Sequence, residues 1–158
     1  MKKTKWFIII FCVVIVILLI VCLFGIFNNK KELVCRNKYE QTEYTIDSEY
    51  IIKAKRDKVT NAEVNILIRS ENEEKLNNLK DKYTEQFEHD KTTYGGYTFN
   101  IDTKTGSLSI KVNIDYSKLN FNKYLEDNVS LKSYMENKYT IDNAKKLYES
   151  NGATCKYN

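Results

Sequence analysis

The chain has 158 residues, a formal net charge of +4, 12 tyrosines, 7 phenylalanines, four cysteines and no proline. Three of its 25 basic residues precede Trp6 and all 21 acidic residues follow Phe27, so the part beyond Phe27 carries a net charge of only +1. Nucleic-acid-binding domains are usually strongly basic with clustered Lys and Arg, so the sequence does not predict nucleic acid as a partner.

The first predicted element is a transmembrane helix over residues 6–27. This run of 22 residues contains no charge, amide, hydroxyl or proline. As a helix it measures about 33 Å, against about 30 Å of bilayer hydrocarbon. A cleavable signal peptide is the rival interpretation, but its apolar core is about 7–15 residues long and precedes a small-residue cleavage site. Cys22 follows three large aliphatic residues, which does not fit a lipidation site.

Orientation is predicted from size, because basic residues flank the run on both sides in nearly equal number. A long C-terminal domain crosses a membrane largely regardless of its charge. We therefore expect a cytoplasmic tail at 1–5, a juxtamembrane linker at 28–38 and an extracytoplasmic domain at 39–158 of a single-pass cell-membrane protein. Basic residues of the linker are expected to contact anionic lipid headgroups, at about 1 kcal/mol each: Lys30, Lys31, Arg36 and Lys38.

The four cysteines fall into two groups. Cys12 and Cys22 lie in the apolar run, where free cysteine packs as a small hydrophobic residue. Cys35 and Cys155 bracket the domain with 119 residues between them. In an oxidising compartment such a pair predicts a disulfide. The alternative is two free thiols in a cytosolic domain.

The domain begins with a predicted antiparallel hairpin. Apolar residues alternate with polar ones over 42–54 and again over 59–69, which is typical of strands with one buried face. The polar stretch 56–58 supplies the turn. Ser70 and Glu73 then form a predicted capping box, and an amphipathic helix follows until Gly95-Gly96 at the latest.

A second hairpin is predicted from strands at 97–101 and 108–116, with a turn at 102–106 in which Gly106 takes a positive φ. Residues 117–138 give no clear pattern beyond one or two helical turns. Thr140 is expected to cap a last helix that ends at Asn151-Gly152, before a short strand at 153–157. The predicted fold is α+β, with two antiparallel hairpins in ββα-ββα order and the helices on one face of the sheet.

No pattern predicts a catalytic, cofactor-binding or metal-binding residue. The only histidine, His89, lies near the end of a predicted helix, and the five glycines match no phosphate-binding loop. Carboxylates on the polar strand faces, namely Asp47, Glu49, Asp102 and Asp115, have no spacing that singles out an acid–base pair.

Tyrosine is the one excess in the composition. Five tyrosines lie outside the periodic apolar faces, and exposed tyrosine often anchors a protein interface. The residues predicted for such an interface are Tyr39, Tyr94, Tyr124, Tyr134 and Tyr157.

The order of elements, the segment 107–116 (SLSIKVNIDY), the segment 144–147 (AKKL) and the closing 152–155 (GATC) resemble the YehR-like family of small bacterial extracytoplasmic lipoproteins. The resemblance implies an α+β fold on the outer side of a bacterial membrane. Family members commonly carry a lipidated N-terminal cysteine, whereas this chain keeps a full spanning run. The resemblance implies no particular activity.

These patterns favour a membrane-anchored, non-enzymatic binding or cell-envelope-associated module with a protein, peptide or cell-wall partner. Two alternatives from other classes stay open. One is a cell-surface hydrolase that uses the strand carboxylates, and the other is a small accessory subunit of a membrane complex.

Overall fold

The computed structural model describes Ile15, residues 30–135 without the side chain of Ser130, and residues 139–158. The predicted transmembrane helix at 6–27 lies outside these residues apart from Ile15. Within the described ranges, every helix is too short or too polar to cross a bilayer. The chain divides into two units, residues 1–30 and residues 31–158, and the second contains the folded domain.

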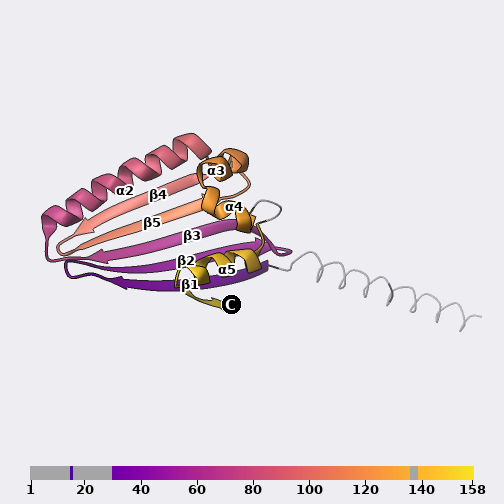
Figure 1. The fold of residues 1–158 in the computed structure, drawn as a ribbon, viewed down its shortest axis with the longest axis horizontal. Helices are drawn as coiled ribbons and strands as arrows, with labels where there is room; N and C mark the ends of the chain where they lie inside the picture. The colour runs from indigo at the N-terminus through magenta and orange to yellow at the C-terminus, as the bar shows by residue number, and fades with distance from the viewer. Residues whose placement is uncertain (1–14, 16–29, 136–138) are drawn as a thin grey trace, which may run out of the picture. The chain divides into compact units, whose positions relative to one another are not determined.

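The domain is a six-stranded sheet with helices on one face (Figure 1). The strand order is β4-β5-β3-β2-β1-β6, and the pairs β4·β5, β5·β3, β3·β2 and β1·β6 are antiparallel. The elements are β1 (Lys30–Glu40), β2 (Thr45–Lys55), β3 (Lys58–Arg69), α2 (Glu73–Tyr94), β4 (Tyr97–Lys104), β5 (Ser107–Asp115), α3 (Phe121–Asp127), α4 (Val129–Met135), α5 (Ile141–Ser150) and β6 (Thr154–Tyr157). The predicted α+β class is confirmed.

Both predicted hairpins are present, but the sheet is larger than two hairpins. β1 and β6 add a third antiparallel pair at one edge, with Cys35 directly opposite Cys155. The residues expected as a linker at 28–38 therefore lie largely in a strand, and Leu33 and Cys35 are fully buried. Leu33 and Cys35 are the only buried residues of β1. The alternation of apolar and polar residues is therefore too short to predict the strand from the sequence.

The first hairpin turns at Arg56 and Asp57, whose φ angles are 49° and 70°. Two-residue hairpin turns of this kind are usually made by Asn and Gly, which tolerate positive φ. Contacts from the start of α5 and from β1 hold this turn. The Ile141 N–H donates to the Asp57 carbonyl at 2.8 Å, and Lys31 Nζ lies 2.6 Å from Asp57 Oδ1.

The predicted capping box at the start of α2 is wrong. Asn72 is the N-cap, and its side chain accepts a hydrogen bond from the Lys75 N–H at 2.9 Å. The Ser70 hydroxyl instead donates to the Glu43 carbonyl at 2.7 Å, and Glu73 accepts from the Gly106 N–H at 2.9 Å. These side chains join three neighbouring loops, which a local capping pattern cannot show. The helix ends before Gly95, as predicted.

The second hairpin has a tighter turn than predicted. β4 and β5 remain paired as far as Lys104 and Ser107, so only Thr105 and Gly106 form the turn. Gly106 has the expected positive φ of 72°. Gly96 also has positive φ, and a Cβ there would lie 2.6 Å from the Asp115 carbonyl oxygen.

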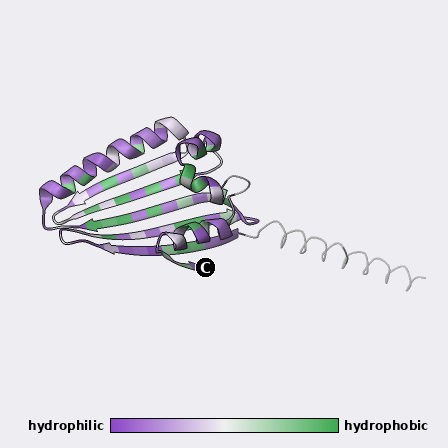
Figure 2. Ribbon diagram, viewed as in Figure 1, coloured by the Kyte–Doolittle hydropathy of each residue, from purple (hydrophilic) through white to green (hydrophobic). Residues whose placement is uncertain are grey.

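The ambiguous segment after β5 contains α3 and α4, and Thr140 caps α5 as predicted by accepting from the Asn143 N–H at 3.2 Å. All four helices α2–α5 contribute buried residues to the core on one side of the sheet. One cluster lies around Leu33, Ile52 and Ile141, and the other around Ile68, Leu76 and Leu108. Figure 2 shows the resulting alternation of hydrophobic and hydrophilic residues along the strands.

Candidate functional site on the open face of the sheet

The opposite face of the sheet is covered by none of the described helices, and we call it the open face. Strand periodicity places its side chains there, because successive residues of a strand point to opposite faces. Ile66 and Ile68 of β3 belong to the helix-covered core, so Asn65 and Leu67 point the other way. Asp47 and Glu49 of β2, which are paired with Leu67 and Asn65, point the same way.

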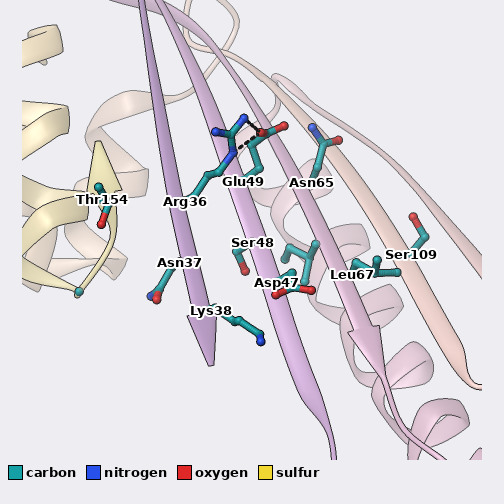
Figure 3. Close-up of a pocket in the computed structure, with 12 residues that line it drawn as sticks. Arg36, Asn37, Lys38, Asp47, Ser48, Glu49, Asn65, Leu67, Ser109 and Thr154 are labelled. Atoms are coloured by element: carbon teal, nitrogen blue, oxygen red, sulfur yellow. Dashed lines mark hydrogen bonds and ion pairs between the residues drawn. The ribbon is translucent and has the colours of Figure 1, made fainter. Parts of the chain in front are cut away.

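This open face contains a solvent-exposed hollow of about 740 Å³ (Figure 3). Side chains from several strands meet there, although they are far apart in the sequence. Its lining includes Arg36, Asn37 and Lys38 of β1, Asp47, Ser48 and Glu49 of β2, Asn65, Ile66 and Leu67 of β3, Ser109 of β5, Thr154 of β6, and Gly152 in the turn before β6.

Three ion pairs lie on the open face, each between a basic and an acidic side chain. Arg36 donates to Glu49 with its Nε 2.8 Å from Oε1, Arg69 pairs with Asp47, and the Lys111 Nζ lies 2.8 Å from Glu63. The hydrogen bond from Lys111 holds the pKa of the Glu63 carboxyl below its usual range. The arginine side chains are exposed, and exposed pairs contribute about 0–1 kcal/mol each. The pairs can therefore exchange partners at low cost.

Most of the residues in the lining have polar side chains, and among the described residues none of them is aromatic. Enclosed small-molecule pockets are lined mainly by hydrophobic and aromatic side chains and bury most of the ligand. Leu67 contributes a half-buried apolar side chain to this hollow, and most of the other lining residues carry charged, amide or hydroxyl groups. Such a surface suits a hydrophilic partner that carries both signs of charge.

The candidate carboxylates do not come together in one catalytic arrangement. Asp47 and Glu49 both face the hollow, but each is paired with a different arginine. Asp102 lies on the edge strand β4, and Asp115 accepts from the Ser117 hydroxyl beyond the end of β5. The Ser117 hydrogen bond lowers the pKa of Asp115.

Three of the five tyrosines predicted for an interface are packed in the domain. Tyr94 is buried, with 7% of its surface exposed, and its hydroxyl donates to Asp127 at 3.0 Å. The Tyr124 ring packs edge-on against it at 5.3 Å. Tyr134 is half-buried against the core cluster under α4 and α5. The residue pattern over 117–138 indicates no clear helices, so it does not predict these packing partners.

The other two predicted interface tyrosines are exposed, Tyr39 by 52% and Tyr157 by 46%. They do not share one patch, because Tyr157 pairs with Leu33, which lies about 20 Å along β1 from Tyr39. The Tyr157 hydroxyl donates to Asp142 at 2.5 Å, and this hydrogen bond raises the pKa of Tyr157 to about 12.

The four predicted membrane-surface residues divide along β1. Lys30 and Lys31 are at the start of the strand, whereas Arg36 and Lys38 line the hollow. Lys38 lies about 26 Å from Lys30 along a strand of this geometry. The hollow could not be predicted from the sequence, because the residue pattern predicts neither β1 nor its place beside β2.

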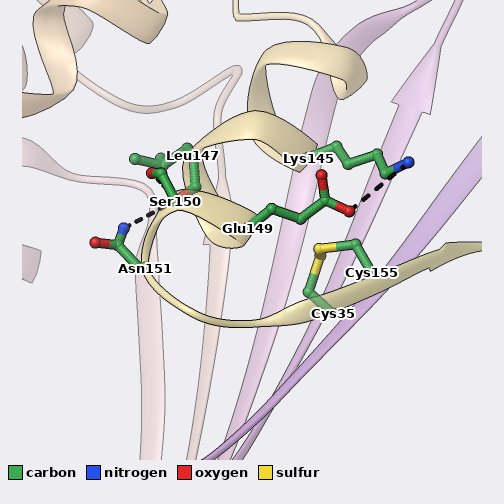
Figure 4. Close-up of a disulfide and its surroundings, with 7 residues drawn as sticks. All are labelled: Cys35, Lys145, Leu147, Glu149, Ser150, Asn151 and Cys155. Atoms are coloured by element: carbon green, nitrogen blue, oxygen red, sulfur yellow. Dashed lines mark hydrogen bonds and ion pairs between the residues drawn. A yellow bond between two sulfur atoms is a disulfide. The ribbon is translucent and has the colours of Figure 1, made fainter.

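The predicted disulfide between Cys35 and Cys155 is confirmed, with an S–S distance of 2.02 Å (Figure 4). It joins strands β1 and β6 on the helix-covered side, beside α5. The two residues are separated by 120 positions, and a closed loop of about 100 residues stabilises a fold by roughly 4–5 kcal/mol in the chain-entropy model.

Metal-ligating residues do not cluster in the described ranges, where groups of three or more His, Cys, Asp and Glu side chains are absent. His89 is exposed on α2, with its Nε2 3.4 Å from the Thr93 hydroxyl.

These features define an α+β domain whose sheet is covered by helices on one face and whose edge strand β6 is joined to its neighbour β1 by a disulfide. No protein-family model matches the chain, and no curated protein matches it.

Two solved structures are similar to it. The NMR structure of the Escherichia coli YehR protein has a TM-score of 0.53 and 15% identity, with 80% of this chain and 92% of that chain covered. The NMR structure of a protein from Streptococcus pneumoniae TIGR4 has a TM-score of 0.51 and 15% identity, with 82% and 86% covered. At this identity the similarity supports a YehR-like fold and nothing beyond the fold.

Proposed function

We propose that this protein is a membrane-anchored, non-enzymatic binding module that presents the open face of its sheet to a hydrophilic protein or peptide segment in the cell envelope. The observation that carries the proposal is the hollow on the open face. Five strands contribute to its lining, while the helices and the aromatic core occupy the other side.

The anchor and the compartment are supported by separate observations. The uncharged run at 6–27 has the length of a membrane span. The disulfide is of a kind that persists mainly in oxidising compartments, which favours a C-terminal domain outside the cytoplasm.

Charge arrangement favours a peptide or protein over an enclosed small molecule. Arg36 and Lys38 supply positive charge at one side of the hollow, and Asp47 and Glu49 supply negative charge on the next strand. An extended segment with both acidic and basic residues can pair with these groups along the face. Since the internal pairs are exposed and weak, their replacement by partner contacts costs little.

The binding proposal is tested by site-specific photocross-linking of the full chain in its native membrane. A photoreactive residue at Ser109, inside the hollow, should give a discrete cross-linked product. The charge reversal Arg36→Glu should remove this product without changing the amount of folded protein. A photoreactive residue at Lys82, exposed on α2, is the matched control. Equal products from both positions, or a product insensitive to Arg36→Glu, would contradict binding at the hollow.

The topology is tested with a membrane-impermeant maleimide on intact cells. If the domain is extracytoplasmic, Cys35 and Cys155 should be labelled only after reduction of the disulfide. Labelling that requires lysis but no reductant would place the domain in the cytoplasm and overturn the proposed location.

A further inference from the structure

The end of the domain at which β1 begins carries exposed basic residues from the β2–β3 turn. Lys55, Arg56 and Lys58 are all exposed there. The turn is tied to the first residues of β1, because Lys31 Nζ lies 2.6 Å from Asp57 Oδ1. Figure 1 shows the β2–β3 turn at the end of the sheet opposite to the end at which α2 begins.

The chain length before the domain keeps this end close to any membrane that holds the uncharged run. Only residues 28–30 lie between Phe27 and Lys31. Four residue steps span at most about 14 Å. The headgroup layer is about 5–8 Å thick on each side of the hydrocarbon, so Lys31 lies within about a Debye length of the lipid surface.

The β2–β3 turn is held in place by the rest of the domain. Arg56 and Asp57 both have positive φ, where Asn and Gly are the usual residues. The Ile141 N–H donates to the Asp57 carbonyl at 2.8 Å, and Lys58 forms an isolated antiparallel β-bridge with Thr140. The turn therefore presents its basic side chains on a fixed backbone, in a conformation that the residue types alone do not favour.

The two ends of the sheet differ in charge. Around the β2–β3 turn the bases are Lys31, Lys55, Arg56 and Lys58, and the acids are Glu32, Asp57 and Asp142. At the same end of the sheet, Asp115 at the end of β5 is paired with Lys118. At the other end, the loops before β2 and α2 carry Glu43, Glu71, Glu73 and Glu74, with Arg69, Lys75 and Lys104 as the bases. Anionic lipid attracts the first end and repels the second.

We propose that Lys31 and the β2–β3 turn (55–58) form a docking surface for an anionic bilayer and hold the domain with its acidic loops away from the membrane. This inference rests on the proposed membrane anchor. In this arrangement Arg36 and Lys38, which were predicted to contact headgroups, face the hollow instead. The residues of the β2–β3 turn take their place as headgroup contacts. The hollow then stands roughly 20–26 Å along β1 from the strand's first residue, where it is open to partners.

The test uses the full chain reconstituted in vesicles of phosphatidylcholine alone and in vesicles containing about 30% phosphatidylglycerol. Lysine acetylation with an impermeant reagent is followed by mass spectrometry at each site. In the anionic vesicles we expect the labelling rates of Lys55 and Lys58 to fall at least about threefold and to recover in high salt. Lys104, in the turn region at the other end, should be unchanged. The variant Arg56→Gln should weaken the protection, and Lys104→Gln should not.

The outcomes separate the two proposals. If the chain inserts into both vesicles but Lys55 and Lys58 react equally in them, the docking surface is wrong and the anchor stands. Protection of Lys104 instead would reverse the orientation and also overturn the inference. If the chain does not float with either type of vesicle, the anchor is wrong and the docking surface falls with it.

Discussion

The two faces of the sheet use the same strands for opposite purposes. On the helix-covered face of β3, Ile68 is fully buried, whereas its neighbour Leu67 lies half-buried among ion pairs on the open face. The covered face gathers the aromatic rings and the disulfide, and the hollow on the open face is lined by none of the described aromatic residues. Most of the stabilising contacts therefore lie on one side of the sheet, which leaves the other side free to bind.

The largest expected effect comes from the disulfide on the covered side. Cys155→Ala should lower the free energy of unfolding by about 2–5 kcal/mol, because β1 and β6 are then joined only by strand pairing. Urea denaturation of the full chain in a mild detergent measures this change. Thr154→Ala, on the adjacent residue that lines the hollow, should change it by about 0.5 kcal/mol or less. If both variants lower the free energy of unfolding equally, the covered face does not contribute more to stability than the open face.

Ile68 and Leu67 are neighbours on β3 that point to opposite faces of the sheet. Ile68→Ala should cost about 2–5 kcal/mol, since it leaves a cavity in the cluster under α2. Leu67→Ala should cost about 1 kcal/mol or less, because its side chain already meets solvent. The same denaturation experiment measures both. If Leu67→Ala is as costly as Ile68→Ala, the open face must be covered in the native protein.

Alkaline pH should act through the covered face. Burial raises the pKa of Tyr139. Burial is also the main cause that raises the pKa values of Tyr116 and Tyr148, and nearby tyrosines raise them further. These folded-state values lie above the unfolded value, so their stabilisation is complete below about pH 10 and is lost as the pH rises further. Each tyrosine then lowers the free energy of unfolding by up to about 1.4 kcal/mol per pH unit.

Urea denaturation between pH 8 and pH 11.5 measures this decline. Tyr139→Phe keeps most of the ring packing and removes one ionisable hydroxyl, so its curve should fall less steeply than that of the wild type. A wild-type stability that stays constant up to pH 11.5 would show that the phenols are solvated in the folded protein.

Sequence periodicity was sufficient for the central hairpins because their buried positions alternate over many residues. Ile52 on β2, Ile68 on β3 and Ile110 on β5 are all buried as the pattern of two predicts. The two strands at the β6 edge of the sheet, β1 and β6, were harder. β6 has four residues, and β1 sends only Leu33 and Cys35 into the core.

The hollow could not be predicted because it depends on tertiary order. Arg36 meets Glu49 only because β1 lies beside β2, and Ser109 joins them only because β5 lies beside β3. No local pattern encodes that strand order. The capping of α2 failed for a similar reason, since Ser70 is occupied by the carbonyl of a distant loop residue, Glu43.

The smallest expected effect on stability lies in the hollow itself. The Arg36–Glu49 pair is exposed, so Arg36→Ala, Glu49→Ala and the double variant should each change the free energy of unfolding by about 1 kcal/mol or less. A double-mutant cycle should give a coupling energy in the same range. The same variants should nevertheless remove the cross-link from Ser109, because they delete charges that face the proposed partner. A coupling energy of several kcal/mol, or a cross-link that survives in the double variant, would assign this pair to the structure of the sheet and not to binding.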